Sequence, residues 1–243
     1  MVDERRAEGV GNEDLMDMLL SARDADTGEP LTQEELRQEL ITLFLAGHET
    51  SANGLTYAFM LLEGHPEVME KVLTEIDQVL GNEDISFGKL REFTYLKQVI
   101  DETLRLYPPA WVIGREALKP DQIGELKLET GDNIALFIYG LHHNAKYWPD
   151  PEKFDPERFS EINKKDRPTH AYLPFGGGPR LCVGHQFAIV EMQIALIMLL
   201  RKYRLTRTNP DETLGLVASV TLRPKTPILM KFEERESVSR LTV

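Results

Sequence analysis

The sequence predicts a mainly α-helical protein of the α+β class, and three observations support this. Four segments with helical spacing of apolar residues lie within residues 13–107, and a fifth, strongly apolar one follows Cys182. Short β-prone segments, separated by Gly, Asp and Asn, occupy residues 111–141 and recur near the C-terminus. Helices and strands do not alternate, so a doubly wound sheet is not expected.

The longest predicted helix begins at a capping box. Residues 13–23 first form a short amphipathic helix that ends in a polar turn. Thr32 and Glu35 then match the pattern Thr-x-x-Glu ahead of an apolar run, which opens a helix that continues to Leu62. About thirty residues at 1.5 Å each give roughly 45 Å, enough to cross a whole domain.

Two further helices are predicted before the sequence changes from helical to β-prone patterns. One runs from Pro66 to Leu80, and Pro66 suits the first turn while Gly81 ends the helix. The other covers about residues 94–107 and is ended by two prolines. The β-prone segments of 111–141 then predict a small antiparallel or mixed sheet with tight turns.

A long irregular stretch extends from His142 to Pro174 and is rich in proline and aromatic residues. Loops of this length inside compact domains usually carry function. The strongly apolar helix after Cys182 and C-terminal strands or hairpins complete the predicted fold.

Composition narrows the class of protein. The 28 Lys and Arg residues against 40 Asp and Glu give a net charge of −12, which disfavours nucleic acid as a partner. A single cysteine allows no internal disulfide and no zinc site built on several cysteines. No apolar run approaches the ~20 residues that a membrane span needs, and the first residues lack the apolar stretch of a signal peptide. We therefore expect a cytoplasmic protein without a membrane anchor.

Small residues form a stripe along the long predicted helix. Ala46, Thr50 and Gly54 recur at four-residue spacing, and Gly47 adjoins Ala46, so one helix face projects little side chain. Each mid-helix glycine costs roughly 1 kcal/mol relative to alanine, which something must offset. Two interpretations remain: close packing of another helix, or a flat or small ligand that rests beside the Thr50 hydroxyl.

Charged residues in the predicted helix 94–107 and in the irregular stretch do not indicate a function by themselves. Glu102 and Arg105 lie three residues apart and off the apolar face, so periodicity predicts a solvated ion pair. Residues 156–159, Pro-Glu-Arg-Phe, read as a loop with a charged pair and a buried phenylalanine.

Cys182 has two interpretations. A lone cysteine is usually a small buried hydrophobe. Its setting favours a ligand instead, because a helix begins at or just after it and helix N-termini stabilise a thiolate. The three glycines 176–178 let the main chain approach a bulky planar partner, and Arg180 adds a fixed charge.

Taken together, these residues resemble the cytochrome P450 family, the haem-thiolate monooxygenases. The cysteine region matches every fixed position of the family signature Phe-x-x-Gly-x-Arg-x-Cys-x-Gly, with Phe175, Gly178, Arg180, Cys182 and Gly184. The long helix matches the family's oxygen-binding motif with Ala46, Gly47 and Thr50. The structural Glu-Arg-Arg arrangement is matched by Glu102, Arg105 and Arg158, and the order and spacing of all these motifs agree.

The resemblance implies a cofactor and its ligands. Cys182 Sγ would be the axial thiolate on the iron of haem b, iron protoporphyrin IX. Arg180 and Arg115 would pair with the haem propionates. Phe175 would pack close to the thiolate, and Gly176 and Gly184 belong to the same cofactor-binding loop. Backbone N–H groups after Cys182 would hydrogen-bond the sulfur and tune the iron.

The resemblance also implies catalytic and structural roles. Ala46 and Gly47 would leave room for dioxygen over the opposite haem face, while Thr50 would help deliver protons, with Glu49 as a relay. Glu102, Arg105 and Arg158 would form a buried ion network that holds the cysteine loop against the core. The substrate cavity would be lined by residues 109–113 and 216–220.

Members of the family are considerably longer than 243 residues. The whole chain is therefore expected to be a single incomplete domain, 1–243, that corresponds to the C-terminal haem-binding part of the P450 fold without its N-terminal half. The implied activity inserts oxygen from O2 into an apolar, fatty-acid-like small molecule, with electrons from a ferredoxin- or flavodoxin-type donor. Two alternatives stay open: a catalytically idle haem-binding fragment, and a structural protein whose Cys182 is simply buried.

Overall fold

The computed structural model of the chain describes residues 2, 5, 11, 14–210 and 214–235. The chain divides into two compact units, residues 1–49 and 50–243, and each is described by itself. The helix α3 (Gln33–Gly64) contributes residues to both units. Among the described residues, no helix combines the length and the apolar character that crossing a membrane requires.

The first unit is organised by helix caps. In α2 (Leu15–Ser21), the Asp14 carboxylate accepts a hydrogen bond from the Asp17 N–H, and Arg5 pairs with both carboxylates at 2.8 and 2.9 Å. At the start of α3, Glu35 Oε2 accepts from the Thr32 N–H at 2.8 Å, and Thr32 Oγ1 accepts from the Glu35 N–H at 3.3 Å. The capping box predicted from the sequence is thus confirmed, and it fixes where the long helix begins.

The second unit is built on four helices that share one apolar core. The C-terminal part of α3 meets three more helices: α4 (Pro66–Leu80), α5 (Thr94–Leu106) and α7 (His185–Lys202). The bounds predicted for α4 are confirmed, and α5 ends one residue before the predicted limit. The largest fully buried apolar side chains of this core include Tyr57, Leu62, Ile76, Leu96, Ile100 and Leu196.

Gly54 shows why part of the small-residue stripe exists. A Cβ placed on Gly54 would lie 3.1 Å from Met192 Cε on α7 and 3.6 Å from Leu104 Cδ2 on α5. Such a contact with Met192 is tighter than ordinary packing allows, so the glycine permits α3, α5 and α7 to approach closely. For Gly54, the helix-packing interpretation is therefore the correct one.

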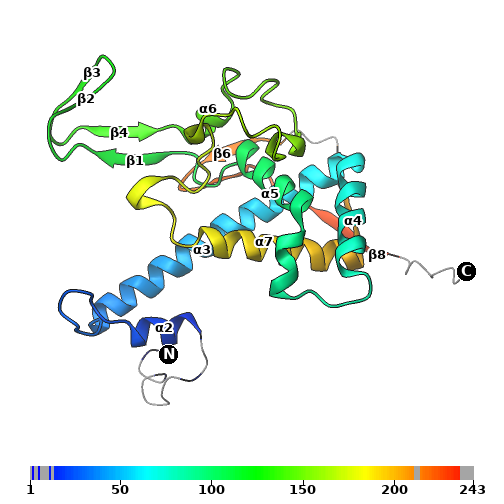
Figure 1. The fold of residues 1–243 in the computed structure, drawn as a ribbon, viewed down its shortest axis with the longest axis horizontal. Coiled ribbons are helices and arrows are strands. Elements are labelled where there is room, and N and C mark those ends of the chain that lie inside the picture. Colours follow the sequence, from blue (N-terminus) through cyan, green and yellow to red (C-terminus); the bar gives the residue numbers. More distant parts are fainter. Residues whose placement is uncertain (1, 3–4, 6–10, 12–13, 211–213, 236–243) are drawn as a thin grey trace, which may run out of the picture. The chain divides into compact units, whose positions relative to one another are not determined.

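Within the part of the chain that the structure describes, the strands form four separate antiparallel pairs. One pair is β1 (Ile113–Glu116) with β4 (Asn133–Leu136). The other three pairs are β2 (Asp121–Ile123) with β3 (Leu126–Leu128), β5 (Tyr203–Arg207) with β8 (Met230–Glu234), and β6 (Leu216–Ala218) with β7 (Leu222–Pro224). Figure 1 shows the pair of β2 and β3 extending beyond one end of the ribbon of β1 and β4. All the described pairs are antiparallel, so the mixed alternative does not arise in them.

One β-prone segment is a helix instead. Residues after Leu136 leave the ribbon and form α6 (Ile138–His142). Ile138 and His142 are both buried four residues apart, which is helical spacing, and the Leu141 N–H donates to the Phe137 carbonyl at 3.0 Å. Burial of one helical face outweighs the β propensity of this short apolar run.

The irregular stretch is held by aromatic side chains. It contains the 3-10 turns η2 (Pro156–Phe159) and η3 (Thr169–Ala171); η4 (Gly178–Arg180) follows it, and η1 (Phe87–Glu92) precedes α5. The rings of Trp148, Phe159 and Tyr172 contact one another, and the Arg167 guanidinium lies 4.1 Å from the Trp148 ring centroid. This cluster gives a loop without regular structure its own small core.

Candidate haem-thiolate site

The cysteine loop, residues 175–184, is shaped by glycines and by one backbone clasp. Gly176 and Gly178 have φ of 73° and 68°, a left-handed conformation that other residues rarely adopt. The Cys182 N–H donates to the Phe175 carbonyl at 3.0 Å and closes the loop. The Cys182 thiol is exposed, so its interpretation as a small buried hydrophobe is wrong.

The sulfur lies beside the first turn of α7. Gly184 is the N-cap residue of this helix, and a Cβ placed on it would stand 4.0 Å from Cys182 Sγ. Backbone N–H groups and the positive end of an 18-residue helix favour negative charge at this position. The thiol is therefore presented where a thiolate ligand is electrostatically favoured.

His185 also shapes this turn, although the sequence did not single it out. Its Nδ1 lies 2.9 Å from the Cys182 carbonyl oxygen, and its ring centroid is 6.1 Å from that of Phe175. Its position three residues after the cysteine, at a helix start, is the only signal that could have indicated this role.

Apolar side chains flank the thiol on the surface. Val183 is 87% exposed and Phe187 74% exposed, and Leu181 is also largely open to solvent. Large apolar side chains exposed side by side in sequence mark a surface that binds an apolar partner.

The strand β1 packs against the cysteine loop and carries a second arginine, Arg115. A Cβ on Gly176 would lie 3.4 Å from Ile113 Cδ1, so this residue of β1 packs against the loop. Arg115 is two residues further along the strand and therefore on the same face. Arg115 is half-buried and donates to the Gly114 carbonyl, while Arg180 is exposed on the loop itself.

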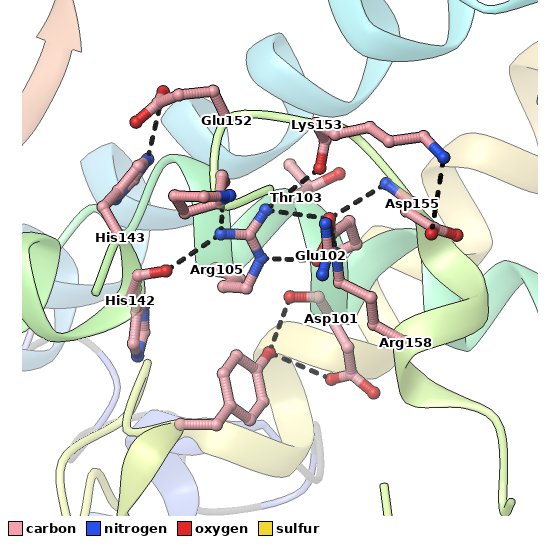
Figure 2. A network of polar contacts seen from close by, with 12 residues as sticks. Asp101, Glu102, Thr103, Arg105, His142, His143, Glu152, Lys153, Asp155 and Arg158 are labelled. Atoms are coloured by element: carbon pink, nitrogen blue, oxygen red, sulfur yellow. Dashed lines mark hydrogen bonds and ion pairs between the residues drawn. The ribbon is translucent and has the colours of Figure 1, made fainter. Parts of the chain in front are cut away.

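A buried ion network joins α5 to the irregular stretch (Figure 2). Arg105 donates to Glu102 through Nε at 2.7 Å and through Nη2 at 2.9 Å, and both side chains are 0% exposed. Arg158 Nε is 3.3 Å from Glu102 Oε1, which also accepts from the Asp155 N–H at 2.9 Å. Burial raises the pKa of the Glu102 carboxyl, and the hydrogen bonds from Arg105 oppose that shift.

The solvated pair expected from periodicity for Glu102 and Arg105 is thus wrong. Arg105 also donates to the carbonyls of His142, Pro151 and Lys153, at 2.9, 2.7 and 3.2 Å. These carbonyls belong to the irregular stretch, which covers the polar face of α5. A helical pattern shows which face is apolar, but it cannot show that a distant loop buries the other one.

The remaining motif residues lie on α3. Ala46, Gly47 and Glu49 are exposed in the first unit, while Thr50 is half-buried at the start of the second. Because the two units are described separately, the roles of Ala46, Gly47 and Glu49 stay predictions.

A family model described as Cytochrome P450 matches residues 2–232. The chain belongs to the cytochrome P450 family. It is 36% identical over 223 residues to cytochrome P450 4V2 of Mus musculus, covering 91% of this chain and 42% of the relative. It is also 36% identical over 225 residues to putative cytochrome P450 132 of Mycobacterium tuberculosis, covering 93% of this chain and 48% of that protein.

Solved P450 structures have the same fold. The cytochrome P450DA heme domain matches with a TM-score of 0.90 and 32% identity, over 97% of this chain and 52% of that one. The retinoic acid-bound cyanobacterial CYP120A1 matches with a TM-score of 0.91 and 33% identity, over 96% of this chain and 54% of that one. The chain spans about half the length of the P450 relatives that it matches.

The cysteine loop of this P450 chain fits haem. P450 proteins bind haem through a cysteine thiolate, and Cys182 is the only cysteine of the chain. The loop offers an exposed sulfur, a main chain without side chains at residues 176–178, apolar flanks for a porphyrin, and Arg180 for a carboxylate. Arg115 on β1 is a second candidate cation. A thiolate donor for the iron, an apolar wall for the ring and cations for the propionates suit haem-thiolate binding.

The two segments expected to line the P450 substrate cavity lie together. The Leu222 N–H donates to the Pro109 carbonyl at 2.9 Å, and Trp111 Nε1 donates to the Ser219 carbonyl at 2.8 Å. Asn53 Nδ2 on α3 donates to Thr221 Oγ1 at 3.1 Å, so the helix reaches the same turn. Val220, at the tip, is 90% exposed.

Proposed function

We propose that this chain is the haem-binding part of a monooxygenase. The reaction consumes O2, two electrons and two protons, places one oxygen atom in a C–H bond of an apolar substrate, and releases the other as water. The observation that supports this most directly is the exposed Cys182 thiol at the start of α7, in a chain that belongs to the P450 family.

The cysteine loop would hold the cofactor. When bound, haem supplies iron chemistry that activates dioxygen. Cys182 Sγ would be the iron ligand, and the clasp from its N–H to the Phe175 carbonyl keeps the sulfur outside the core. Arg115 and Arg180 would each pair with a propionate, because Arg180 lies on the cysteine loop and Arg115 is on the strand whose Ile113 packs against that loop.

Proton delivery would fall to α3. The Thr50 hydroxyl would donate a proton at the dioxygen-binding face, and Glu49, the residue before it, would resupply that proton from solvent. Ala46 and Gly47, one turn earlier, would leave the space that dioxygen needs.

The substrate we propose is an apolar molecule of the fatty-acid-like class. Val220 and the apolar residues 109–113 and 216–218 would provide its contacts, because the two segments lie together and Val220 is 90% exposed at their tip. The similarity to CYP120A1, solved with retinoic acid bound, supports an apolar substrate with a carboxylate.

The electron donor would dock on a basic groove beside the cysteine loop. A groove of about 1000 Å³ lies between η1, α5, the 159–172 segment and α7, and its α7 lining begins at Gln186. Five cations line it against two carboxylates, in a chain whose net charge is −12; they are Arg91, Lys97, Lys164, Lys165 and Arg167, against Asp101 and Glu161. This charge favours a small acidic protein of the ferredoxin or flavodoxin type.

A spectrum of the purified chain tests the core of the proposal. The reduced protein in carbon monoxide should show the red-shifted Soret band of thiolate ligation, and Cys182→Ser should lose it because a hydroxyl does not replace the thiolate. Phe187→Leu is a matched control that alters the neighbouring surface but keeps the sulfur. Haem uptake with the same Soret position in the wild type and in Cys182→Ser would contradict the proposal.

A catalytically idle haem-binding fragment is the second candidate, and the half-length match to P450 relatives favours it. Peroxide as a surrogate oxidant separates the two, since it bypasses the electron donor. Product formation supports the monooxygenase, whereas bound haem without product supports the idle fragment. The cytoplasmic location stays a prediction from composition.

A further inference from the structure

His142, the last residue of α6, touches two parts of the proposed site that no sequence motif connects. Its carbonyl accepts a hydrogen bond from Arg105 Nη1 at 2.9 Å, within the buried ion network. Its ring Nε2 accepts a hydrogen bond from the backbone N–H of Leu173 at 2.9 Å. The residue is 0% exposed, so both contacts are shielded from water.

The state of the imidazole follows from these partners. Nε2 accepts from an N–H group, so a neutral ring carries its proton on Nδ1. Nδ1 is buried; it makes no hydrogen bond of good geometry among the described residues, while the nearby backbone of Arg105 and Leu104 favours the protonated ring. Burial lowers the pKa of His142 to about 3, so the ring is neutral near pH 7.

The hydrogen bond from the Leu173 N–H makes a purely packing role a poor explanation for His142. Leucine or phenylalanine could fill the space beside Trp148 and Tyr172, but neither would accept the hydrogen bond from the Leu173 N–H. The acceptor at Nε2 is the one property of the imidazole that an apolar side chain cannot replace. The contact with Leu173 therefore accounts for the histidine.

Backbone hydrogen bonds connect Leu173 to the cysteine loop and, within that loop, to Cys182. Its carbonyl accepts from the Gly176 N–H at 3.1 Å, and the Phe175 carbonyl accepts from the Cys182 N–H at 3.0 Å. A Cβ on Gly177 would lie 3.4 Å from Leu173 Cδ2, so the loop also folds over this side chain. Orientation of the Leu173 peptide thus fixes the start of the loop that presents Cys182.

We propose that His142 is a positioning residue for the cysteine loop: through one buried residue, the Glu102–Arg105–Arg158 network sets the place of the Cys182 sulfur. The consequence for iron ligation rests on the proposed function, but the structural coupling does not. A loop released from His142 would hold Sγ less firmly and lose thiolate ligation more easily.

Three substitutions separate the ring contact from packing, since the His142 carbonyl remains in each. His142→Gln can place its side-chain oxygen near the position of Nε2 and keep an acceptor for Leu173. His142→Asn has the same amide but is one bond shorter and reaches only the region of Nδ1. His142→Leu fills the space without an acceptor. His143→Leu is the control, because that ring bonds to the Tyr139 carbonyl and not to the loop.

Amide hydrogen exchange of the haem-free 243-residue chain is the first measurement. The peptide covering residues 172–183 should exchange about tenfold faster in His142→Asn and His142→Leu, because a buried N–H has lost its acceptor. His142→Gln and His143→Leu should stay near wild type, and the peptide covering α7 residues 192–200 should keep its protection in all variants. Equal exchange in the Gln and Asn variants would overturn the proposal, even if the Leu variant does not fold.

Haem-loaded protein provides the second measurement. The fraction of the carbon monoxide complex with the thiolate-type Soret band should fall in His142→Asn and be retained in His142→Gln. An unchanged fraction in His142→Asn contradicts the consequence for ligation. If the wild type binds no haem, the proposed function fails, while the exchange experiment still decides the coupling.

Discussion

At the scale of single residues, burial decides what each charged group does. Glu102 and Arg105 are 0% exposed and share two hydrogen bonds, whereas the Lys97–Asp101 pair on the same helix is partly open to water. Both pairs look alike in the sequence, since they are opposite charges three or four residues apart on α5. Removing one member of the buried pair strands a charge, whereas removing one member of the exposed pair changes little.

Arg105→Leu should therefore destabilise the chain strongly. Glu102 would lose both hydrogen bonds from Arg105, and three backbone carbonyls would lose their donor. We expect a loss of about 3–5 kcal/mol in the free energy of unfolding, measured by urea titration. Lys97→Leu is the matched control and should cost no more than about 0.5 kcal/mol. Similar losses for both variants would contradict a structural role for the network.

The lowered pKa of His142 makes the stability of the folded chain depend on pH. Its pKa is about 3 in the folded chain, against an ordinary 6.5, so below pH 6.5 the unfolded chain binds a proton that the folded chain does not. Stability from this group is complete above pH 6.5 and falls by roughly 1.4 kcal/mol per pH unit between 6.5 and 3. His142→Gln should reduce this slope between pH 6.5 and 5 in urea unfolding. The same slope in both proteins would show that the ring does not carry it.

At the scale of elements, helices that carry local start and stop residues could be predicted from the sequence. Structure that depends on burial by distant loops could not. The capping box and the Pro66 and Gly81 boundaries are local, and the helices they delimit lie where expected. α6 was read as a strand because five residues carry too little periodicity, and its burial comes from the rest of the fold. The cysteine loop could be predicted from its motif, but the contact between His142 and Leu173, just before that loop, joins residues 31 positions apart.

The small-residue stripe of α3 yields a prediction about packing. Gly54→Leu should cost about 1–3 kcal/mol, because its side chain would overlap Met192 and Leu104. Met192→Ala should recover part of that loss in the double variant, which a double-mutant cycle by urea unfolding can measure. Gly47→Leu, on an exposed turn of the same helix, should be neutral or stabilise by up to ~1 kcal/mol. Additive effects of the Gly54 and Met192 changes would refute the contact.

At the scale of the whole molecule, charge is unevenly distributed. The chain carries a net charge of −12, yet one groove gathers five cations beside the helix that follows Cys182. Acidic proteins repel acidic partners at long range, so a local basic surface is the feature that can select one orientation of an acidic donor. Apolar residues along α7 line the same groove and would contribute contact area once the partner is oriented.

Reversal of charge in this groove should weaken donor binding without disturbing the fold. Arg91 and Lys165 are exposed lining residues, so Arg91→Glu with Lys165→Glu should lower the affinity for a small acidic ferredoxin about tenfold at low salt. The difference should shrink as ionic strength rises, since exposed charges are screened. Titration calorimetry of donor into the 243-residue chain measures both effects. Lys127→Glu on β3, outside the groove, is the control with the same charge reversal per residue. Equal weakening by Lys127→Glu would mean that only net charge matters, and unchanged affinity in the groove variant would place the donor elsewhere.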